Sequence, residues 1–523
     1  MSQVEIARRS TRGSFALFGG NLLSTVFSFV AIVFIARFLG PSQYGVYTLA
    51  VLIPTILLNF VGFGVNSGVT RFAAYHLSQG RPELAKRMTV NGVTFLVLFG
   101  ASLAVVSYAG SGILSSFVLQ RAEISSFVQF ASLLIVAQTL FQAAVAALLG
   151  WSEMGNIGLT NILQGLLRLA ITLPLLVLGF AVLGALTGYV FSVALAGALS
   201  VVILWRNMSG ASTKPMEGFV SDIRTMLSYG KTLFVGQFVT NISAQYVVVI
   251  LATVASNTYV GFYQSAANFV IAITLTSGAI SQALFPAFAH LQGTEGDVTR
   301  AFTYATKYTG FVLTPIIFLL MGASIPVIQV SLGSSYGVAS SYLALLAFSN
   351  VSLLFGAGVL PSFFNGVGQP KFYMEFSLVG AVLQVVLAPL FTIVLGLGIL
   401  GLIASTLVSN IAAVVSGVYL ASHFFRARID IPACLSILVS SILAFLVVLP
   451  LEVSHFNQFV LLLLEIGVFA GVYLTAAPLL RAIRPEDLEI LGSALVGLGR
   501  FKTIILPILA YERFILRHSS RRT

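Results

Sequence analysis

The chain has 523 residues, of which 58% are hydrophobic and only 8% are charged. Soluble domains carry about 25% charged residues, so this composition excludes an ordinary soluble protein and indicates a chain that lies in lipid. The single cysteine, Cys434, and five scattered histidines leave no disulfide framework and no metal site. We expect no cofactor. The net charge of +11 indicates loops that face anionic lipid rather than nucleic acid.

Apolar segments long enough to cross a membrane recur along the whole chain. A transmembrane helix needs about 20 apolar residues, and the sequence holds fourteen such segments. We place them at 14–36, 44–67, 89–109, 125–149, 160–181, 183–205, 230–252, 259–284, 306–330, 339–364, 373–396, 399–422, 432–450 and 457–480. The sequence thus predicts an all-α polytopic membrane protein.

Basic residues are sorted between the two sides of these spans. Nearly all of the 27 Lys and Arg residues fall in the N-terminal arm, in every second loop or in the C-terminal tail. Because positively charged loops stay in the cytoplasm, both termini are predicted to be cytoplasmic, in a cell membrane. Arg37 and Arg121 lie outside this set, and Arg168 lies inside the fifth span.

An internal repeat relates the two halves of the chain. At an offset of 216 residues, the ungapped matches are Leu17, Phe18, Gly20, Val33, Ala36, Gly45, Tyr47 and Ala50 with Leu233, Phe234, Gly236, Val249, Ala252, Gly261, Tyr263 and Ala266. Gly150 and Gly366 keep the same offset. Each copy holds six spans, an even number, so the copies are predicted to be parallel lobes of a transporter.

The repeat divides the chain into six segments. We assign 1–13 to a cytoplasmic arm, 14–205 to the N-lobe, 206–229 to a cytoplasmic linker, 230–422 to the C-lobe, 432–480 to helices 13 and 14, and 481–523 to a cytoplasmic tail. Leucines in the tail follow a helical stripe with basic residues nearby, which predicts helices on the inner leaflet. A tail that binds a partner protein is the alternative.

Ionisable groups inside a membrane cost about 3 kcal/mol or more, which makes them candidates for function. Asn161, Gln164 and Arg168 recur at i, i+3 and i+7 of the fifth span and therefore share one face. We expect that face to line water.

Amide side chains recur at helical spacing in other spans as well. They are Asn21 in the first span, Gln138 and Gln142 in the fourth, Gln237, Asn241 and Gln245 in the seventh, and Gln264 and Asn268 in the eighth. Together these stripes predict a hydrated substrate cavity. The alternative is hydrogen bonding between helices, worth about 0.6 kcal/mol for each bond.

Three basic residues are candidates to give this cavity a positive potential. Arg37 ends the first span on the outer side, against the positive-inside rule, and Lys231 stands at the entrance of the seventh span. With Arg168 they would suit an anionic head group, because guanidinium pairs with phosphate oxygens in a fork. Glu465 is the only deep carboxylate of the predicted spans. A structural role is its first interpretation, and coupling to a proton or cation is the alternative.

Enzymatic function is not indicated. The sequence has no GxxxxGK[ST] motif and no soluble segment long enough to hold a nucleotide. The longest outward loop, 110–124, carries only Arg121 and Glu123 as charged residues, too few for a catalytic site. We predict no catalytic residue and no metal.

Several motifs resemble one known family. ARFLGPSQYGVY, from Ala36 to Tyr47, strongly resembles the junction of helices 1 and 2 in Wzx-type polysaccharide flippases of the multidrug/oligosaccharidyl-lipid/polysaccharide (MOP) superfamily. GVTRFAAYHLSQGRPELAKR, from Gly68 to Arg87, is similar to the loop after their second helix. NGVGQ, from Asn365 to Gln369, is similar to the turn after their tenth.

The resemblance implies two six-helix lobes that form a V around a cationic cavity. It further implies translocation of a polyprenyl-(pyro)phosphate-linked oligosaccharide from the inner to the outer leaflet, with glycan polymerase or ligase machinery as a partner. The drug-exporting branch of the superfamily uses acidic residues in its first lobe, where this sequence has no deep acidic residue. An ion-coupled small-molecule exporter and a membrane glycan polymerase or ligase are the alternative functions.

Overall fold

The computed structural model describes residues 3–209, 217–291, 295–453, 456–484, 486–487, 511–512 and 515. Within these ranges the regular structure consists of helices, and no strand occurs. This confirms the predicted all-α class. The chain forms two compact units, Met1–Gln264 and Ser265–Thr523, and each is described by itself.

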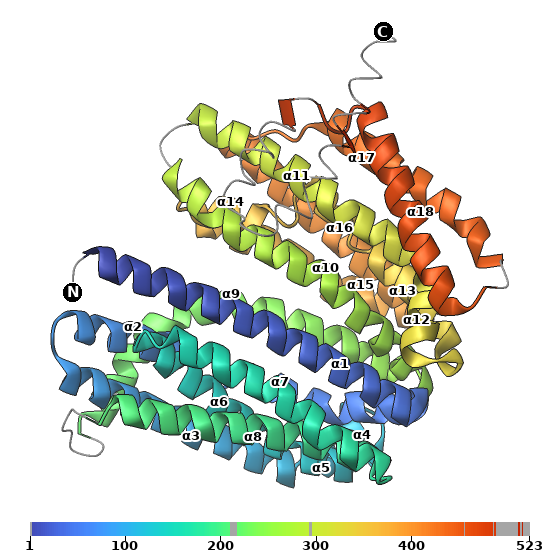
Figure 1. Ribbon diagram of the computed structural model, residues 1–523. Helices are drawn as coiled ribbons and strands as arrows, with labels where there is room; N and C mark the ends of the chain where they lie inside the picture. The colour runs from blue at the N-terminus through green and yellow to red at the C-terminus, as the bar shows by residue number, and fades with distance from the viewer. Residues whose placement is uncertain are drawn as a thin grey trace. The chain divides into compact units, whose positions relative to one another are not determined.

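The first unit is built from long helices that run side by side (Figure 1). Its helices are α1 (Gln3–Leu58), α2 (Val65–Ser78), α3 (Pro82–Ala109), α4 (Ser111–Phe117), a 3-10 turn (Ala122–Ile124), α5 (Ser125–Ala131), α6 (Leu133–Gly150), α7 (Met154–Val177), α8 (Ala181–Asn207) and α9 (Phe219–Val254). α7 packs against α1 and α8, and α2 packs against α3, α6 and α9. α10 (Asn257–His290) begins in this unit and continues into the second.

The second unit repeats this pattern of paired helices. It contains α11 (Glu295–Gly322), α12 (Ser324–Leu332), α13 (Gly337–Phe348), α14 (Leu360–Gly366), α15 (Pro370–Pro389), α16 (Gly398–Phe425), α17 (Ile431–Val448) and α18 (Gln458–Leu479), with short 3-10 or π turns at Ser334–Tyr336, Val351–Phe355, Leu390–Val394 and Leu449–Val453. α15 packs on α16, α11 packs on α13 and α17, and α17 packs on α18.

The helices account for the predicted membrane spans. Twelve helical segments of the described residues are long and apolar enough to cross a membrane. The first of them, Ala16–Leu58, holds two predicted spans, because the backbone leaves helical geometry at Gly40 (φ 68°). α9 carries the seventh predicted span. The protein is therefore a multi-pass membrane protein with about the predicted number of spans.

Several predicted spans are interrupted, most clearly at 44–67 and 339–364, and the prediction of continuous helices there was wrong. The span predicted at 44–67 ends at Leu58, and residues 59–64 form turns before α2 starts. Gly62 and Gly64 have φ angles of 87° and 86°, which L side chains rarely adopt and glycine tolerates. The span predicted at 339–364 is likewise divided, with Gly356 at φ 101° between the pieces.

Other boundaries also differ from the prediction. α11 runs from Glu295 to Gly322, whereas we predicted a span at 306–330. α9 begins at Phe219, inside the segment 206–229 that we predicted as a linker loop, because Gly218 (φ 64°) starts the helix there. The compact units divide after Gln264, so α9 belongs to the first unit. Residues 210–216 and most of the tail 481–523 lie outside the described residues.

Equivalent glycines of the two repeat copies make equivalent contacts. A Cβ at Gly150 would lie 2.9 Å from the Cβ of Ala73, and a Cβ at Gly366 would lie 2.6 Å from the Cβ of Phe288. With the 216-residue offset, Phe288 corresponds to the neighbour of Ala73. Each copy therefore packs the end of its fourth span on the end of its second span in the same way.

The repeat also produces one reciprocal contact. A Cβ at Gly45 would overlap the carbonyl oxygen of Asn257, and a Cβ at Gly261 would overlap the carbonyl oxygen of Pro41. The offset converts Gly45 into Gly261 and Pro41 into Asn257. The two contacts are thus the same contact made twice, as a two-fold axis between the copies requires.

We expect Gly45→Ala and Gly261→Ala each to destabilise the protein by about 1–3 kcal/mol, because the added methyl has no space beside the facing carbonyl. The check is the thermal midpoint of the purified full-length protein in detergent. Gly471→Ala in α18 is the matched control, since nothing lies within 4 Å of the added methyl. Equal midpoints for all three variants would contradict the close contact.

Polar contacts attach α9 at both ends to helices of the first repeat copy. Arg87 on α3 donates from Nε and Nη2 to the two carboxylate oxygens of Asp222, each at 3.1 Å. Asn91 donates to the same carboxylate at 2.8 Å. At the other end, Arg121 donates to the carbonyl oxygens of Ala252, at 2.8 Å, and Ala255. This capping of α9 explains why Arg121 departs from the predicted charge sorting.

A second buried aspartate is held in the same place of the second copy. Lys307 corresponds to Asn91 by the repeat offset, and its ammonium forms an ion pair with Asp487. Tyr308 donates to the other oxygen of Asp487 at 2.9 Å, and the backbone N–H of Arg484 donates at 2.7 Å. The segment after α18 is therefore attached to α11 much as the start of α9 is attached to α3.

We expect Lys307→Ala to cost about 3–5 kcal/mol, because it leaves the Asp487 carboxylate buried without its charged partner. Lys307→Asn should cost less than Lys307→Ala, since an asparagine amide can donate to Asp487 as Asn91 donates to Asp222. Chemical unfolding of the purified protein measures both. A Lys307→Asn variant as unstable as Lys307→Ala would show that an amide cannot hold Asp487 in the way that Asn91 holds Asp222.

Candidate functional site

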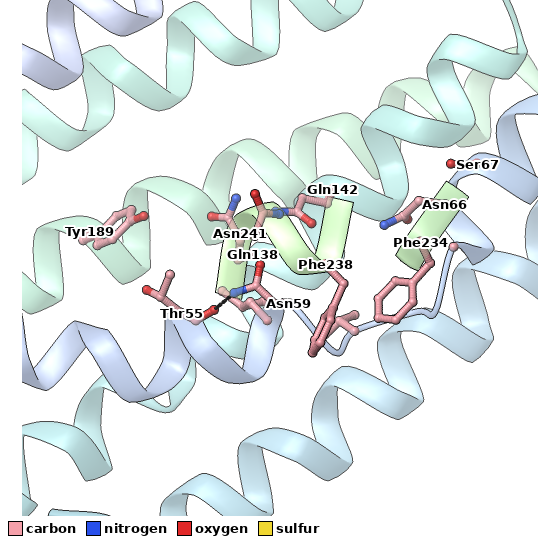
Figure 2. Close-up of a pocket in the computed structure, with 13 residues that line it drawn as sticks. Thr55, Asn59, Asn66, Ser67, Gln138, Gln142, Tyr189, Phe234, Phe238 and Asn241 are labelled. Carbon is pink, nitrogen blue, oxygen red and sulfur yellow. Dashed lines mark hydrogen bonds between the residues drawn. The ribbon is translucent and has the colours of Figure 1, made fainter. Parts of the chain in front are cut away.

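A polar chamber lies in the first unit, among helices that span the membrane. Its volume is about 300 Å³, at the lower end of the range for small-molecule sites. Five of its side chains are amides, and Figure 2 shows the lining residues as sticks. The lining residues are Thr55, Leu58, Asn59, Val61, Gly64, Asn66, Ser67, Gln138, Gln142, Tyr189, Phe234, Phe238 and Asn241. We call this cavity the first-unit chamber.

The break between α1 and α2 forms one side of this chamber. Asn59, Val61 and Gly64 come from the break itself. The Asn59 amide donates to the carbonyl oxygen of Thr55 at 3.0 Å, which satisfies one acceptor at the end of α1. A Cβ at Gly64 would overlap the backbone of Gly230 on α9, so only glycine permits this approach. At membrane depth, irregular backbone is tolerated where it is buried in protein or lines a water-filled cavity.

The structure brings three predicted amides together. Gln138 and Gln142 on α6 and Asn241 on α9 all line the first-unit chamber. An adjoining cavity of about 270 Å³ shares both glutamines and is also lined by Asn161. Asn161 donates to the side-chain oxygen of Asn21 at 2.6 Å. For Asn21 and Asn161, hydrogen bonding between helices and contact with a cavity thus occur together.

Arg168 lies behind the chamber and not on its surface. Its side chain is 7% exposed. Nη2 donates to the hydroxyl of Tyr47 at 3.0 Å, and Cζ lies 4.1 Å from the ring centroid of Tyr189. The Nε of Arg168 has no hydrogen-bond partner among the described residues. Tyr189 lines the chamber, so its ring stands between the guanidinium and the cavity.

The second repeat copy has a neutral pair at the equivalent place. The 216-residue offset converts Arg168 into Gln384 and Tyr189 into Ser405. Gln384 is buried and its amide donates to the hydroxyl of Ser405 at 3.2 Å. The first copy thus has a side-chain contact between α7 and α8, and the second copy has one between α15 and α16. Only the contact in the first copy includes a positive charge.

The remaining predicted residues lie in several environments. Arg37, just before the Gly40 break, and Lys231 on α9 are exposed, whereas Gln164, Gln245 and Gln264 are half-buried and Asn268 is buried. The lining of the first-unit chamber includes none of them. The side chain of Gln237 lies outside the described part of the chain. The structure thus brings Asn241 and the two α6 glutamines into one site, and leaves the other predicted ligands apart from it.

Glu465 is fully buried in α18 of the second unit. Neither of its carboxylate oxygens has a hydrogen-bond partner among the described residues. A buried carboxylate without a partner is costly. The structural role and the coupling role considered for Glu465 from the sequence both stay hypotheses.

Sequence reasoning missed several lining residues. Thr55, Asn59, Asn66, Ser67 and Tyr189 fall in segments that appeared as ordinary apolar spans or their ends. The available signal was the pair Gly62 and Gly64 in the second span. Glycine-interrupted hydrophobic segments are the best indicator of a binding site in transporters.

Comparisons with known proteins agree with this architecture. Residues 34–341 match the family model described as "Polysaccharide biosynthesis protein". The chain is 22% identical to the probable low-salt glycan biosynthesis flippase Agl15 of Haloferax volcanii, over 76% of this chain and 80% of the relative. It is 24% identical to the succinoglycan biosynthesis transport protein ExoT of Rhizobium meliloti, over 68% of each chain.

Two solved structures have a similar fold. The lipid II flippase MurJ in its inward closed conformation superposes with a TM-score of 0.72 at 15% identity, covering 90% of this chain and 98% of that one. An inward-facing multidrug resistance MATE family transporter of the MOP superfamily gives a TM-score of 0.64 at 17% identity, covering 75% and 92%. The chain therefore shares the fold of these two proteins.

The family match covers more than half of the chain, so this protein belongs to the polysaccharide biosynthesis protein family. This family agrees with the resemblance to polysaccharide flippases that the motif from Ala36 to Tyr47 indicated.

Proposed function

We propose that this protein translocates a polyprenyl-(pyro)phosphate-linked oligosaccharide from the cytoplasmic to the outer leaflet of the cell membrane. The observation that carries the proposal is a polar chamber among membrane-spanning helices of a chain in the polysaccharide biosynthesis protein family. A glycan needs such a water-compatible space to cross the hydrocarbon, whereas its lipid tail can remain in the bilayer. The flippase names of Agl15 and MurJ support the same substrate class.

The proposed mechanism is alternating access, in which the two repeat copies rock about the chain between them. Both termini face the cytoplasm in this proposal, because the basic loops lie on that side. Glycan polymerase or ligase machinery on the outer side would take over the product. These partners are expected because the proposed transport delivers the glycan to the outer side of the membrane.

In this mechanism Arg168 supplies the positive charge that attracts the (pyro)phosphate. Its guanidinium is enclosed by Tyr47 and Tyr189, so it acts through its electric field unless the tyrosines separate during the cycle. A buried charge in a region of low dielectric acts over a longer distance than an exposed one. The field is therefore effective beyond the ring of Tyr189.

Deletion of the gene tests the direction of transport. Membrane-impermeant glycosidase is added to intact and to opened cells, and the protected fraction of lipid-linked glycan is measured. Accumulation on the cytoplasmic leaflet is expected. Accumulation on the outer leaflet would instead indicate a defect after translocation, and would overturn the proposal.

Complementation with Arg168 variants tests the role of the charge. Arg168→Gln, which installs the residue of the second copy, should reduce export roughly tenfold, equivalent to about 1.4 kcal/mol. Arg168→Lys keeps the charge but loses the planar fork, so it should retain part of the activity. Full export by Arg168→Gln at normal abundance would remove Arg168 from the mechanism.

A second candidate function, ion-coupled export of a small molecule, rests on the buried Glu465. Glu465→Gln removes the ionisable group with little change in volume. If Glu465 only packs, export and its dependence on the membrane ion gradient should be unchanged in this variant. Loss of ion-gradient dependence with normal abundance would assign Glu465 to coupling, and loss of drug efflux without glycan accumulation would favour the exporter.

A further inference from the structure

We propose that the first-unit chamber binds uncharged sugar rings that carry hydroxyl or acetamido groups, and that it does not bind the phosphate of the carrier. This inference rests on the proposed function and refines it, because it assigns one chemical part of the substrate to one place. The sequence analysis had expected a cationic cavity for an anionic head group.

The lining of the chamber is polar but neutral. Its amides come from Asn59, Asn66, Gln138, Gln142 and Asn241, and none of its described lining residues is acidic or basic. An amide offers both donors and an acceptor, which matches a sugar hydroxyl that donates and accepts. A phosphate needs charge-assisted donors, and an anion in a neutral cavity is strongly disfavoured.

The predicted ligand Arg168 does not line the chamber. Arg168 lies behind Tyr189, with its guanidinium on the ring face and its Nη2 on Tyr47. Arg168 is therefore not among the residues that line the chamber. The field of Arg168 can attract a phosphate to the neighbourhood, whereas the lining itself recognises neutral groups.

One side of the chamber is aromatic. Phe234 and Phe238 on α9 both line it, with ring centroids 5.2 Å apart. Phe60 packs edge-on against Phe238 at 5.0 Å, and Phe63 packs against Phe234 at 5.2 Å, which fixes both rings. The negative face of an aromatic ring attracts positively polarised C–H groups, and one face of a pyranose ring presents such groups. Amides opposite aromatic rings therefore suit a sugar better than a phosphate (Figure 2).

An unsatisfied acceptor lies at the same place. The side-chain oxygen of Asn66 is buried and has no hydrogen-bond partner among the described residues. A buried side-chain acceptor in a native structure is usually hydrogen-bonded. The chamber volume of about 300 Å³ suits a short stretch of glycan rather than a whole oligosaccharide.

Binding to the purified full-length protein in lipid nanodiscs tests the inference directly. The probes are glucose, galactose, rhamnose, N-acetylglucosamine, glucuronic acid and inorganic pyrophosphate, each followed by saturation-transfer NMR. At least one neutral sugar should bind, and pyrophosphate should not displace it. Binding of glucuronic acid or pyrophosphate alone, or of no probe, would overturn the proposal.

Variants of Gln142 distinguish a neutral site from an anionic one. Gln142→Leu should weaken binding of the neutral sugar about tenfold, because the hydroxyl loses its partner. Gln142→Lys should also weaken it; stronger binding of pyrophosphate together with improved export would instead show an anion site. Gln79→Leu, at an exposed position after α2, is the matched control. Phe238→Leu is a second variant, with weaker sugar binding expected, in case Gln142 variants are not produced at normal abundance.

The two proposals can fail separately. If the deletion strain accumulates glycan on the cytoplasmic leaflet but the Gln142 and Phe238 variants bind sugar and export like the unchanged protein, only the chamber assignment is wrong. If the deletion strain shows no accumulation while the purified protein binds neutral sugars, the proposed function is wrong and the chamber assignment stands.

Discussion

The attachment of α9 to the first repeat copy is the constraint on which the chamber depends. Asp222 holds the start of α9 through Arg87 and Asn91, and Arg121 caps its end. Phe234, Phe238 and Asn241, which lie between these two attachments, complete the chamber. By sequence α9 opens the second copy, but by contacts it belongs to the first unit. Because α9 is attached at both ends, it can form one side of the chamber. The helices of the first repeat copy form the other sides.

The two repeat copies make contacts at equivalent positions, but the residues that make these contacts differ in charge. Asn91 and Lys307 hold buried aspartates at equivalent positions, one by an amide and the other by an ammonium. Arg168 and Gln384 likewise occupy equivalent places, but only the first carries charge. Because packing is determined mainly by shape and position, a duplicated fold tolerates such exchanges. The difference in charge between the two copies then follows from single residues.

The span pattern was predictable from the sequence because each helix must satisfy its own backbone in lipid, which requires long apolar runs. The interruption at 59–64 was not predicted, since Phe60, Val61 and Phe63 are as apolar as the rest of the span. Only Gly62 and Gly64 indicated it. Helix breaks depend on backbone angles that composition does not record.

The candidate site was predicted in part. The spacing of Gln138, Gln142 and Asn241 indicated polar faces, and the structure places those faces on one chamber. The burial of Arg168 could not be inferred, because its two partners come from distant segments, Tyr47 on α1 and Tyr189 on α8. Periodicity tells which residues share a face, but not which side chains of other helices cover that face.

The reciprocal contact at Gly45 and Gly261 has a consequence for the ancestry of the chain. A self-complementary patch that meets its own copy is the signature of an isologous dimer. Here the two patches lie on one polypeptide, and each glycine faces the backbone of the other copy. A gene that encoded only six spans would have needed the same glycine once, in a homodimer. In the present chain the two positions can mutate separately, yet neither has the space to hold a larger residue.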